Sequence, residues 1–241
     1  MLVANWKMNG SETMINNWIE GIKSVPKNIQ SKCIFCPPSC FLYQASNLIK
    51  EKNLEICLGA QDVDPVTENS LTGGISAKML KNMGCQYVII GHSERRNYYG
   101  EKDPLLLKKI LAANSEKLEI IFCIGESLEE KKKEKTFDVL KRQISIITNV
   151  EKAKFFIAYE PVWAIGTGEV AEIQYIKVVH EMIKEELSNV DLKGFNGIIY
   201  GGSIKSDSAK NILAMENVDG LLIGGASLKE KEFSNIVINT L

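Results

Sequence analysis

The sequence predicts a closed α/β barrel in which eight parallel strands alternate with helices, a (β/α)8 barrel. Two observations predict it. Eight short apolar segments alternate with longer segments of helical periodicity along the 241 residues. The short segments are hydrophobic almost without interruption, as in parallel strands that are covered on both faces. Eight such units in this length favour closure, and an open doubly wound sheet is the alternative.

Each expected strand and several helix starts can be placed in the chain. Asp103 followed by Pro104 indicates an N-cap and a first helical position. Ser127–Glu130 and Ser227–Glu230 have the spacing of a capping box. The expected strands are Leu2–Asn5, Cys33–Cys36, Leu54–Leu58, Tyr87–Ile90, Glu119–Cys123, Phe155–Tyr159, Gly197–Tyr200 and Gly220–Ile223.

The composition bounds the size, the partners and the compartment of the protein. No low-complexity linker interrupts the series and 45% of the residues are hydrophobic, so we expect one domain over residues 1–241. The formal net charge of -1 gives no global attraction to nucleic acid or to an anionic membrane. The apolar run at Met1 is too short for a signal peptide, and no run is long enough to span a bilayer. These features favour a cytoplasmic protein that binds neither nucleic acid nor membrane.

Two clusters that could suggest binding sites have simpler structural explanations. Cys33, Cys36 and Cys40 have a spacing that suggests a metal site, but no second pair of ligands completes it. Two of them lie in an apolar run, which favours small buried thiols in a reducing compartment. The charge run Lys131–Lys135 is explained by a solvated helix face, with a basic binding patch as the alternative.

Polar side chains follow three of the expected strands at the point where each strand ends. In an α/β barrel these junctions meet at one mouth, where catalytic groups collect. His92 therefore faces the mouth, with a partly buried structural histidine as the alternative, whereas His180 lies inside a helical pattern and is structural. The junction residues are Asn5 and Lys7 after the first strand, His92, Ser93 and Glu94 after the fourth, and Glu160 after the sixth.

Glu160 ends a buried strand and precedes a loop of unusual composition. Pro161 stops the strand, and Val162–Ile165 is apolar where a loop is normally polar. Gly166 and Gly168 then supply backbone freedom. The pattern is typical of a lid that closes over a site and excludes water from the group on which Glu160 acts. An ordinary connection with a surface glutamate is the alternative.

The last two strands lead into the glycine-rich junctions Tyr200–Ser203 and Ile223–Ser227. Glycine lets backbone N–H groups approach an anion closely, and a helix start behind it adds a favourable dipole. The loops after the seventh and eighth strands of a barrel usually hold phosphate. A double glycine can also be a plain turn, but its occurrence at both positions favours a phosphate site.

A carboxylate, an imidazole, an ammonium group and a phosphate site under a lid fit proton abstraction next to the carbonyl of a small phosphorylated substrate. Glu160 can accept the carbon-bound proton, while His92 polarises the carbonyl and moves protons between oxygens. Lys7 can stabilise the negative charge of an enediolate, with Asn5 as a further donor. The lid keeps water from the enediolate. No metal or redox cofactor is required.

Five blocks of the sequence resemble the triosephosphate isomerase family, in the right order and over essentially the whole chain. They are Asn5–Gly10, Gly91–Arg96, Ala158–Gly168, Tyr200–Ser203 and Gly224–Ser227. The resemblance implies a TIM (β/α)8 barrel that interconverts dihydroxyacetone phosphate and D-glyceraldehyde 3-phosphate in glycolysis and gluconeogenesis. It implies that Glu160 is the base, that His92 is the electrophile, and that Asn5 and Lys7 bind substrate. It also implies a phosphate site formed by Gly166, Ser203, Gly224 and Gly225.

Two positions depart from the family pattern. Glu169 follows the lid where the family usually has lysine, which alters the charge of the lid's hinge. The connection Gln61–Gly74 corresponds to a loop that docks into a neighbouring subunit, so the resemblance implies a homodimer through residues 61–74. This loop reads Thr-Gly-Gly where the family usually reads Thr-Gly-Glu. Because Gly74 has no carboxylate, an ion-pair partner that the resemblance implies for Arg95 or Arg96 is missing.

Two other functions compete with this interpretation. A non-catalytic barrel could bind phosphorylated ligands or a protein partner through its long loop, but Lys7, His92 and Glu160 are all retained. A different phosphosugar isomerase on the same barrel is disfavoured by the sequence of the lid.

Overall fold

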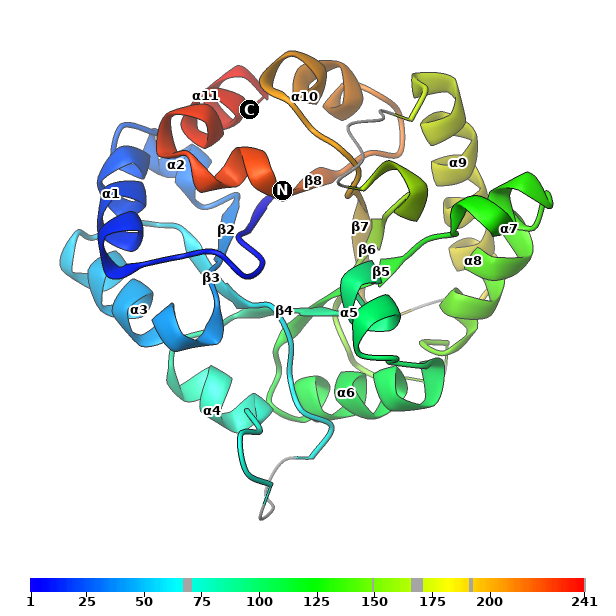
Figure 1. Ribbon diagram of the computed structural model, residues 1–241, viewed down its shortest axis with the longest axis horizontal. Coiled ribbons are helices and arrows are strands. Elements are labelled where there is room, and N and C mark those ends of the chain that lie inside the picture. The colour runs from blue at the N-terminus through cyan, green and yellow to red at the C-terminus, as the bar shows by residue number, and fades with distance from the viewer. Residues whose placement is uncertain (67–70, 149, 166–170, 191–192, 241) are drawn as a thin grey trace.

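The architecture is a closed barrel of eight strands in the order β1 to β8, with every neighbouring pair parallel (Figure 1). The structure is a computed structural model that describes residues 1–66, 71–148, 150–165, 171–190 and 193–240. Pairing of β1 with β8, from Leu2 opposite Leu221 to Ala4 opposite Ile223, closes the ring. The predicted (β/α)8 barrel is therefore confirmed, and the open sheet is excluded.

Seven of the eight strands lie where the sequence predicts them, although two are longer than expected. The strands are β1 Leu2–Asn5, β2 Cys33–Cys36, β3 Cys57–Ala60, β4 Tyr87–Ile90, β5 Glu119–Ile124, β6 Phe155–Tyr159, β7 Phe195–Tyr200 and β8 Gly220–Ile223. The expected strand Leu54–Leu58 is wrong by about half its length. The Leu54 N–H instead donates to the Ile49 carbonyl and ends the preceding helix, and Asn53 has a left-handed backbone there. The strand continues through Gly59 and Ala60, whose small side chains carry no strand signal.

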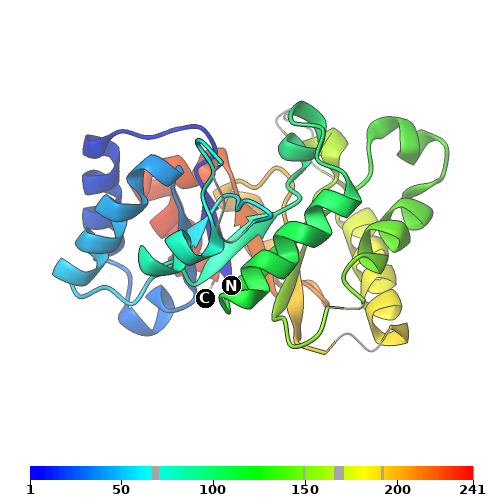
Figure 2. The same cartoon turned by 90° about the horizontal axis from the view of Figure 1, so that it is seen from below.

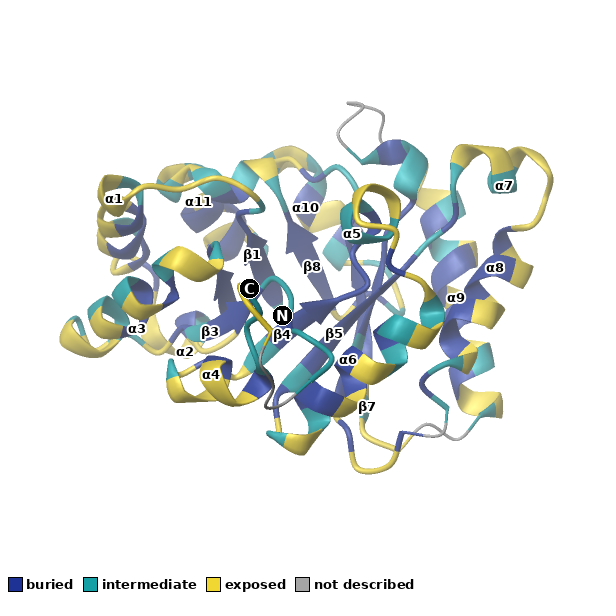
Figure 3. Ribbon diagram, turned by 60° about the horizontal axis from the view of Figure 1, so that its bottom comes forward, coloured by how far each residue is buried: buried dark blue, intermediate teal, exposed yellow. Residues whose placement is uncertain are grey.

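Helices surround the barrel on every side. Figure 2 shows α1, in dark blue, on one flank and α9, in yellow, on the other. Their inward faces are buried and their outward faces are exposed (Figure 3). The helices are α1 Glu12–Ile22, α2 Lys27–Gln30, α3 Leu42–Glu51, α4 Ala77–Asn82, α5 Ser93–Tyr98, α6 Asp103–Ser115, α7 Leu128–Lys132, α8 Thr136–Ser145, α9 Ile173–Asn189, α10 Ser206–Leu213 and α11 Glu230–Thr240, with short 3-10 turns η1 Ser39–Phe41, η2 Val162–Ala164 and η3 Gly225–Leu228.

One of the three predicted N-caps is confirmed. Ser127 and Glu130 form a capping box at the start of α7. The helix predicted at Asp103 and Pro104 does begin there, as α6, but its N-cap is Lys102, one residue earlier than predicted. The Asp103 carboxylate contacts Arg96 and Arg142 and caps no turn. Ser227 lies inside η3, where its hydroxyl donates to the Gly224 carbonyl, so it caps no helix.

The apolar side chains form two layers. The larger lies between the strands and the helices, and a smaller cluster fills the barrel itself. Cys36 and Cys123 belong to the inner cluster, whereas Cys33 faces the outer layer. Burial raises the pKa of Cys33 to about 12, as expected for an inert buried thiol. Burial of Cys33 and Cys36 is confirmed, and Cys40 is exposed.

A pair of tryptophans fixes the two ends of the chain to each other near the barrel mouth. The indole N–H groups of Trp6 and Trp18 both donate to the Ser227 carbonyl, at 3.0 and 2.9 Å. Trp6 follows β1, and Ser227 follows β8. The segment that carries Lys7 is therefore held beside the glycine-rich turn that follows β8.

Among the described residues, no helix is long and apolar enough to cross a membrane.

Candidate active site

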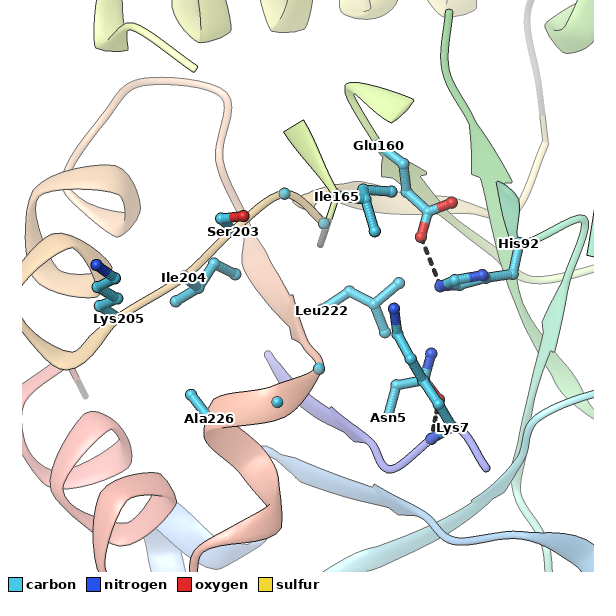
Figure 4. A pocket seen from close by; sticks show the side chains of 14 residues that line it. Asn5, Lys7, His92, Glu160, Ile165, Ser203, Ile204, Lys205, Leu222 and Ala226 are labelled. Atoms are coloured by element: carbon cyan, nitrogen blue, oxygen red, sulfur yellow. Dashed lines mark hydrogen bonds and ion pairs between the residues drawn. The ribbon is translucent and has the colours of Figure 1, made fainter. Parts of the chain in front are cut away.

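A cavity of about 270 Å³ opens where the strands end, and the predicted site residues converge on it (Figure 4). Asn5, Lys7, His92, Glu160, Ser203, Gly224 and Gly225 all line it. Ser93 and Glu94 follow His92 in the chain, and their backbone N–H groups donate to Glu160 and to the His92 ring, respectively. Gly166 lies outside the described residues. The other described lining residues are Ile165, Gly201, Gly202, Ile204, Lys205, Leu222 and Ala226.

Glu160 is a buried carboxylate held by its neighbours. Its own backbone N–H donates to the Ile124 carbonyl at 2.8 Å, so β6 keeps its pairing up to this residue. Only 1% of Glu160 is exposed, which rules out the surface glutamate. Oε2 accepts the Ser93 N–H at 2.9 Å, and Oε1 lies 3.0 Å from Nε2 of His92. Burial raises the pKa of this carboxyl, but its contacts with His92 and Ser93 outweigh burial, and the pKa is lowered.

His92 is the N-cap of α5, which determines the position of its ring proton. The backbone N–H of Glu94 donates to Nδ1 at 3.2 Å, so the neutral ring carries its proton on Nε2, towards Glu160. Burial lowers the pKa of His92 and the Glu160 carboxylate raises it, with a net increase. The upward shift therefore depends on a carboxylate standing beside Nε2.

Lys7 enters the site through a strained turn. Its backbone is left-handed, with φ +52°, a conformation that costs a non-glycine residue about 1–2 kcal/mol. Two side chains hold this turn: Asn5 Oδ1 accepts the Lys7 N–H at 3.1 Å, and Gln61 donates to the Lys7 carbonyl at 2.9 Å. The ammonium then lies 2.6 Å from Glu94. Asn5 and Gln61 therefore position a cation that the backbone alone would not place there.

The junctions after β7 and β8 form a glycine-rich floor beside Lys7. A methyl group added at Gly224 would lie 3.4 Å from Cε of Lys7, and one added at Gly225 would meet no atom within 4 Å. Open space therefore faces Gly225. The Ser203 hydroxyl donates to the Ala164 carbonyl at 2.6 Å, which joins the β7 junction to the base of the predicted lid. This floor is suited to receive an anion on backbone N–H groups.

The base of the predicted lid is fixed by a buried carboxylate, Glu126. It accepts hydrogen bonds from the Tyr159 hydroxyl at 3.1 Å, the Trp163 indole at 2.8 Å and the Tyr175 hydroxyl at 2.8 Å. The ammonium of Lys131 lies 3.3 Å from the centre of the Trp163 ring, a cation–π contact. The prediction of a solvated face over Lys131–Lys135 is thus wrong for Lys131, and the other four residues are exposed. The lid residues 166–169, with the departure at Glu169, lie outside the described residues.

Both arginines of the fourth junction have carboxylate partners within their own chain. Arg95 lies 2.8 Å from Asp62 and 2.7 Å from Glu101, and Arg96 lies 2.8 Å from Asp103. The missing carboxylate of the long loop therefore leaves neither guanidinium unpaired. The residues 67–70 of this loop lie outside the described residues.

Three polar residues of the site are absent from the sequence prediction. Glu126 comes two residues after β5, so the rule that polar residues at strand ends are functional could have found it. Gln61 directly follows β3, the strand whose end was misplaced. Lys205 follows Ser203 by two residues and has no local signal of its own.

The site brings together a buried carboxylate, an imidazole, an ammonium group and a glycine-rich floor. The carboxylate and the imidazole are 3.0 Å apart, and both line the same cavity as the floor. A substrate could present a carbonyl and an adjacent C–H bond to His92 and Glu160, and its phosphate group could then reach the glycine-rich floor.

Comparison with known proteins agrees with this arrangement. The sequence profile of the triosephosphate isomerase family matches residues 1–240. Triosephosphate isomerase from Francisella tularensis subsp. mediasiatica is 42% identical over 244 residues, which covers 98% of this chain and 95% of that protein. Those from Ruthia magnifica and Psychromonas ingrahamii are 40% and 38% identical, each across 98% of this chain and 97% of theirs. The chain belongs to the triosephosphate isomerase family.

Proposed function

We propose that the protein interconverts dihydroxyacetone phosphate and D-glyceraldehyde 3-phosphate, the reaction that its relatives' names state, in glycolysis and gluconeogenesis. One observation carries the proposal most directly. The Glu160 carboxylate and the His92 Nε2 lie 3.0 Å apart in a cavity that also holds Lys7 and a glycine-rich floor. This pairing places a base and a proton donor at adjacent substrate atoms, as an aldose–ketose isomerisation needs.

In the proposed mechanism Glu160 removes a proton from C1 of dihydroxyacetone phosphate. The electrons of the broken C–H bond form the C=C bond of an enediolate, and negative charge develops on the former carbonyl oxygen. His92 gives its Nε2 proton to that oxygen and takes one from the neighbouring hydroxyl. Glu160 then returns its proton to C2, which yields D-glyceraldehyde 3-phosphate. Every hydrogen moves as a proton, so the proposal requires no metal and no redox cofactor.

The contacts of Glu160 and His92 indicate what a bound substrate must change. The Glu160 oxygens are engaged by the Ser93 N–H and by His92, so at least one of these contacts has to break before the carboxylate reaches C1. When a carbonyl oxygen replaces the carboxylate beside Nε2, the largest upward influence on the pKa of His92 is removed, and the weaker influence of Glu94 remains. Burial and the Glu94 N–H then favour the neutral ring as donor. Lys7, beside the floor, stabilises the enediolate charge, and Asn5 holds its turn.

A coupled assay with D-glyceraldehyde 3-phosphate tests the proposal. Glu160→Asp withdraws the carboxylate by one methylene, and we expect kcat to fall by about 100-fold or more while thermal unfolding stays close to wild type. Glu181→Asp, at an exposed glutamate of α9, is the matched control and should keep full activity. A folded wild type without turnover would contradict the proposal and favour a phosphate-binding barrel, which calorimetry with inorganic phosphate would then reveal.

We also propose that the protein is a single-domain cytoplasmic homodimer that docks through residues 61–74. The described ends of this loop extend beyond the helical ring (Figure 1). A groove of about 600 Å³ lies between the loop and the β1 junction, and Met8, Leu71 and Tyr99 are exposed along it. Exposed apolar side chains around a groove suit a protein contact. Sedimentation equilibrium should give twice the 26.9 kDa chain mass, and a monomer at micromolar concentration would contradict the dimer.

A further inference from the structure

We infer that Lys205 is a specificity-determining residue whose positive charge draws the substrate phosphate into the pocket; the inference rests on the proposed function. Lys205 lines the same cavity as Glu160 but lies at the opposite edge, beyond Ile204 (Figure 4). It therefore stands at the entrance to the glycine-rich floor and away from the reacting atoms.

The charge of the cavity lining depends on Lys205. Among the described residues the charged side chains that line the cavity are Lys7, Glu160 and Lys205. The Lys7 ammonium is paired with Glu94 at 2.6 Å, and the Glu160 carboxylate lies 3.0 Å from the His92 ring. Without Lys205 the described lining would therefore hold no unpaired positive charge. A phosphate ester that carries nearly two negative charges at pH 7 would then lose a cation that attracts it as it approaches.

Lys205 carries a charge that is not already paired. No ion pair joins it to any other residue within the described ranges, although Lys7 and Lys109 are both paired there. Its side chain is exposed at the rim. At 0.1 M salt the screening length is about 10 Å, so a rim charge acts on a phosphate that is entering the pocket and is weakened as salt rises.

The position of Lys205 in its helix is unfavourable for stability. It is the N-cap of α10 and makes no side-chain capping bond. Serine, threonine, aspartate and asparagine are the residues that stabilise an N-cap, and a cation opposes the helix dipole there. A residue that breaks a local rule beside a ligand site is expected to serve that site. The sequence thus keeps a positive charge at a position where a capping residue would make the helix more stable.

Lys205→Ser tests this inference because the two effects have opposite signs. Serine supplies the missing cap, so we expect the melting temperature to rise by about 2 °C. The lost charge should lower kcat/KM for D-glyceraldehyde 3-phosphate about threefold at 20 mM ionic strength, and the deficit should vanish near 0.5 M salt. Turnover of D-glyceraldehyde, which lacks the phosphate, should not change.

Matched variants and a binding measurement complete the test. Lys205→Arg retains the charge and should keep the wild-type salt dependence. Lys210→Ser removes an exposed charge from the same helix outside the pocket lining, and kcat/KM should be unaffected. An equal loss of activity at all salt concentrations, or an equal loss on D-glyceraldehyde, would overturn the inference. If wild type does not turn over the triose phosphate, the proposed function fails. Calorimetry with inorganic phosphate then decides this inference alone, since Lys205→Ser must weaken phosphate binding at low salt and unchanged binding would refute it.

Discussion

The two histidines of the chain are both buried, yet their surroundings differ at the level of single atoms. His92 has a carboxylate beside one ring nitrogen and a backbone donor at the other. His180 donates from Nδ1 to the Asn217 carbonyl at 2.8 Å, its ring packs edge-on against Tyr159, and its Nε2 has no hydrogen-bond partner among the described residues. Burial lowers the pKa of His180 to about 4. One ring can take part in proton transfer, while the other is held neutral.

We expect His180 to make the protein less stable in mild acid. In the unfolded chain this histidine takes up a proton near pH 6.5, and in the folded protein only near pH 4. Between those values the unfolded state binds more protons, so the free energy of unfolding falls as the pH falls. The loss from pH 7 to pH 4.5 should be about 2 kcal/mol.

Urea unfolding of wild type and His180→Gln across this pH range measures the effect. Glutamine keeps a donor for the Asn217 carbonyl but does not titrate, so the variant should lose about 2 kcal/mol less than wild type over the same range. Parallel pH profiles for the two proteins would show that the ring takes up its proton equally easily when folded.

At the scale of elements, the ends of the strands determine the site, and glycines there have distinct roles. A methyl group at Gly125, just after β5, would lie 1.8 Å from the Glu160 carbonyl oxygen. Glycine is therefore required for β5 and β6 to approach each other where the proposed base leaves its strand. The methyl group at Gly225 would meet open space, so packing does not require glycine at that position.

Alanine at these two positions should therefore give opposite results. Gly125→Ala forces β6 to move, so we expect a loss of about 3 kcal/mol in the free energy of unfolding together with a lower kcat. Gly225→Ala should leave stability within about 0.5 kcal/mol, because its methyl group meets no atom. It should raise KM by about tenfold, because the methyl group occupies the space left for an anion. Urea unfolding and steady-state kinetics separate the two, and a normal KM for Gly225→Ala would remove this glycine from the phosphate site.

The element scale also explains what the sequence could and could not predict. Strands that are buried on both faces carry a continuous apolar signal, so the sequence predicts seven of them correctly and places the polar residues at their ends around one mouth. The prediction fails for β3 because Gly59 and Ala60 carry no such signal. The hydrogen-bonding role of Glu126 depends on Trp163 and Tyr175, which are far away in the sequence. Contacts of this kind arise only when the barrel closes.

At the scale of the whole molecule, carboxylates of the same chain take the place of the one that the long loop lacks at position 74. Arg95 is shared between Asp62 and Glu101, so a carboxylate at position 74 would find that guanidinium occupied. A side chain at Gly74 would start 3.0 Å from the Asp64 carboxylate. A negative side chain at position 74 is therefore expected to be repelled by Asp64.

Gly74→Glu should accordingly weaken the proposed dimer. We expect its dissociation constant to rise about tenfold relative to Gly74→Gln, which has the same size but no charge. Adding Asp64→Asn to Gly74→Glu should restore part of the loss. Sedimentation velocity across a dilution series measures all three variants. Tighter association of Gly74→Glu would mean that Arg95 accepts a further carboxylate from the second copy.

The pairing of β1 with β8 has a consequence for how the protein is made. On the ribosome the first strand emerges long before its last partner, and Leu2 cannot meet Leu221 until nearly the whole chain has been translated. Until then one edge of β1 and the indoles of Trp6 and Trp18 lack the partners that they have in the finished barrel. The nascent chain thus carries an open sheet edge for most of its synthesis, and this is the interval in which chaperones have the most to protect.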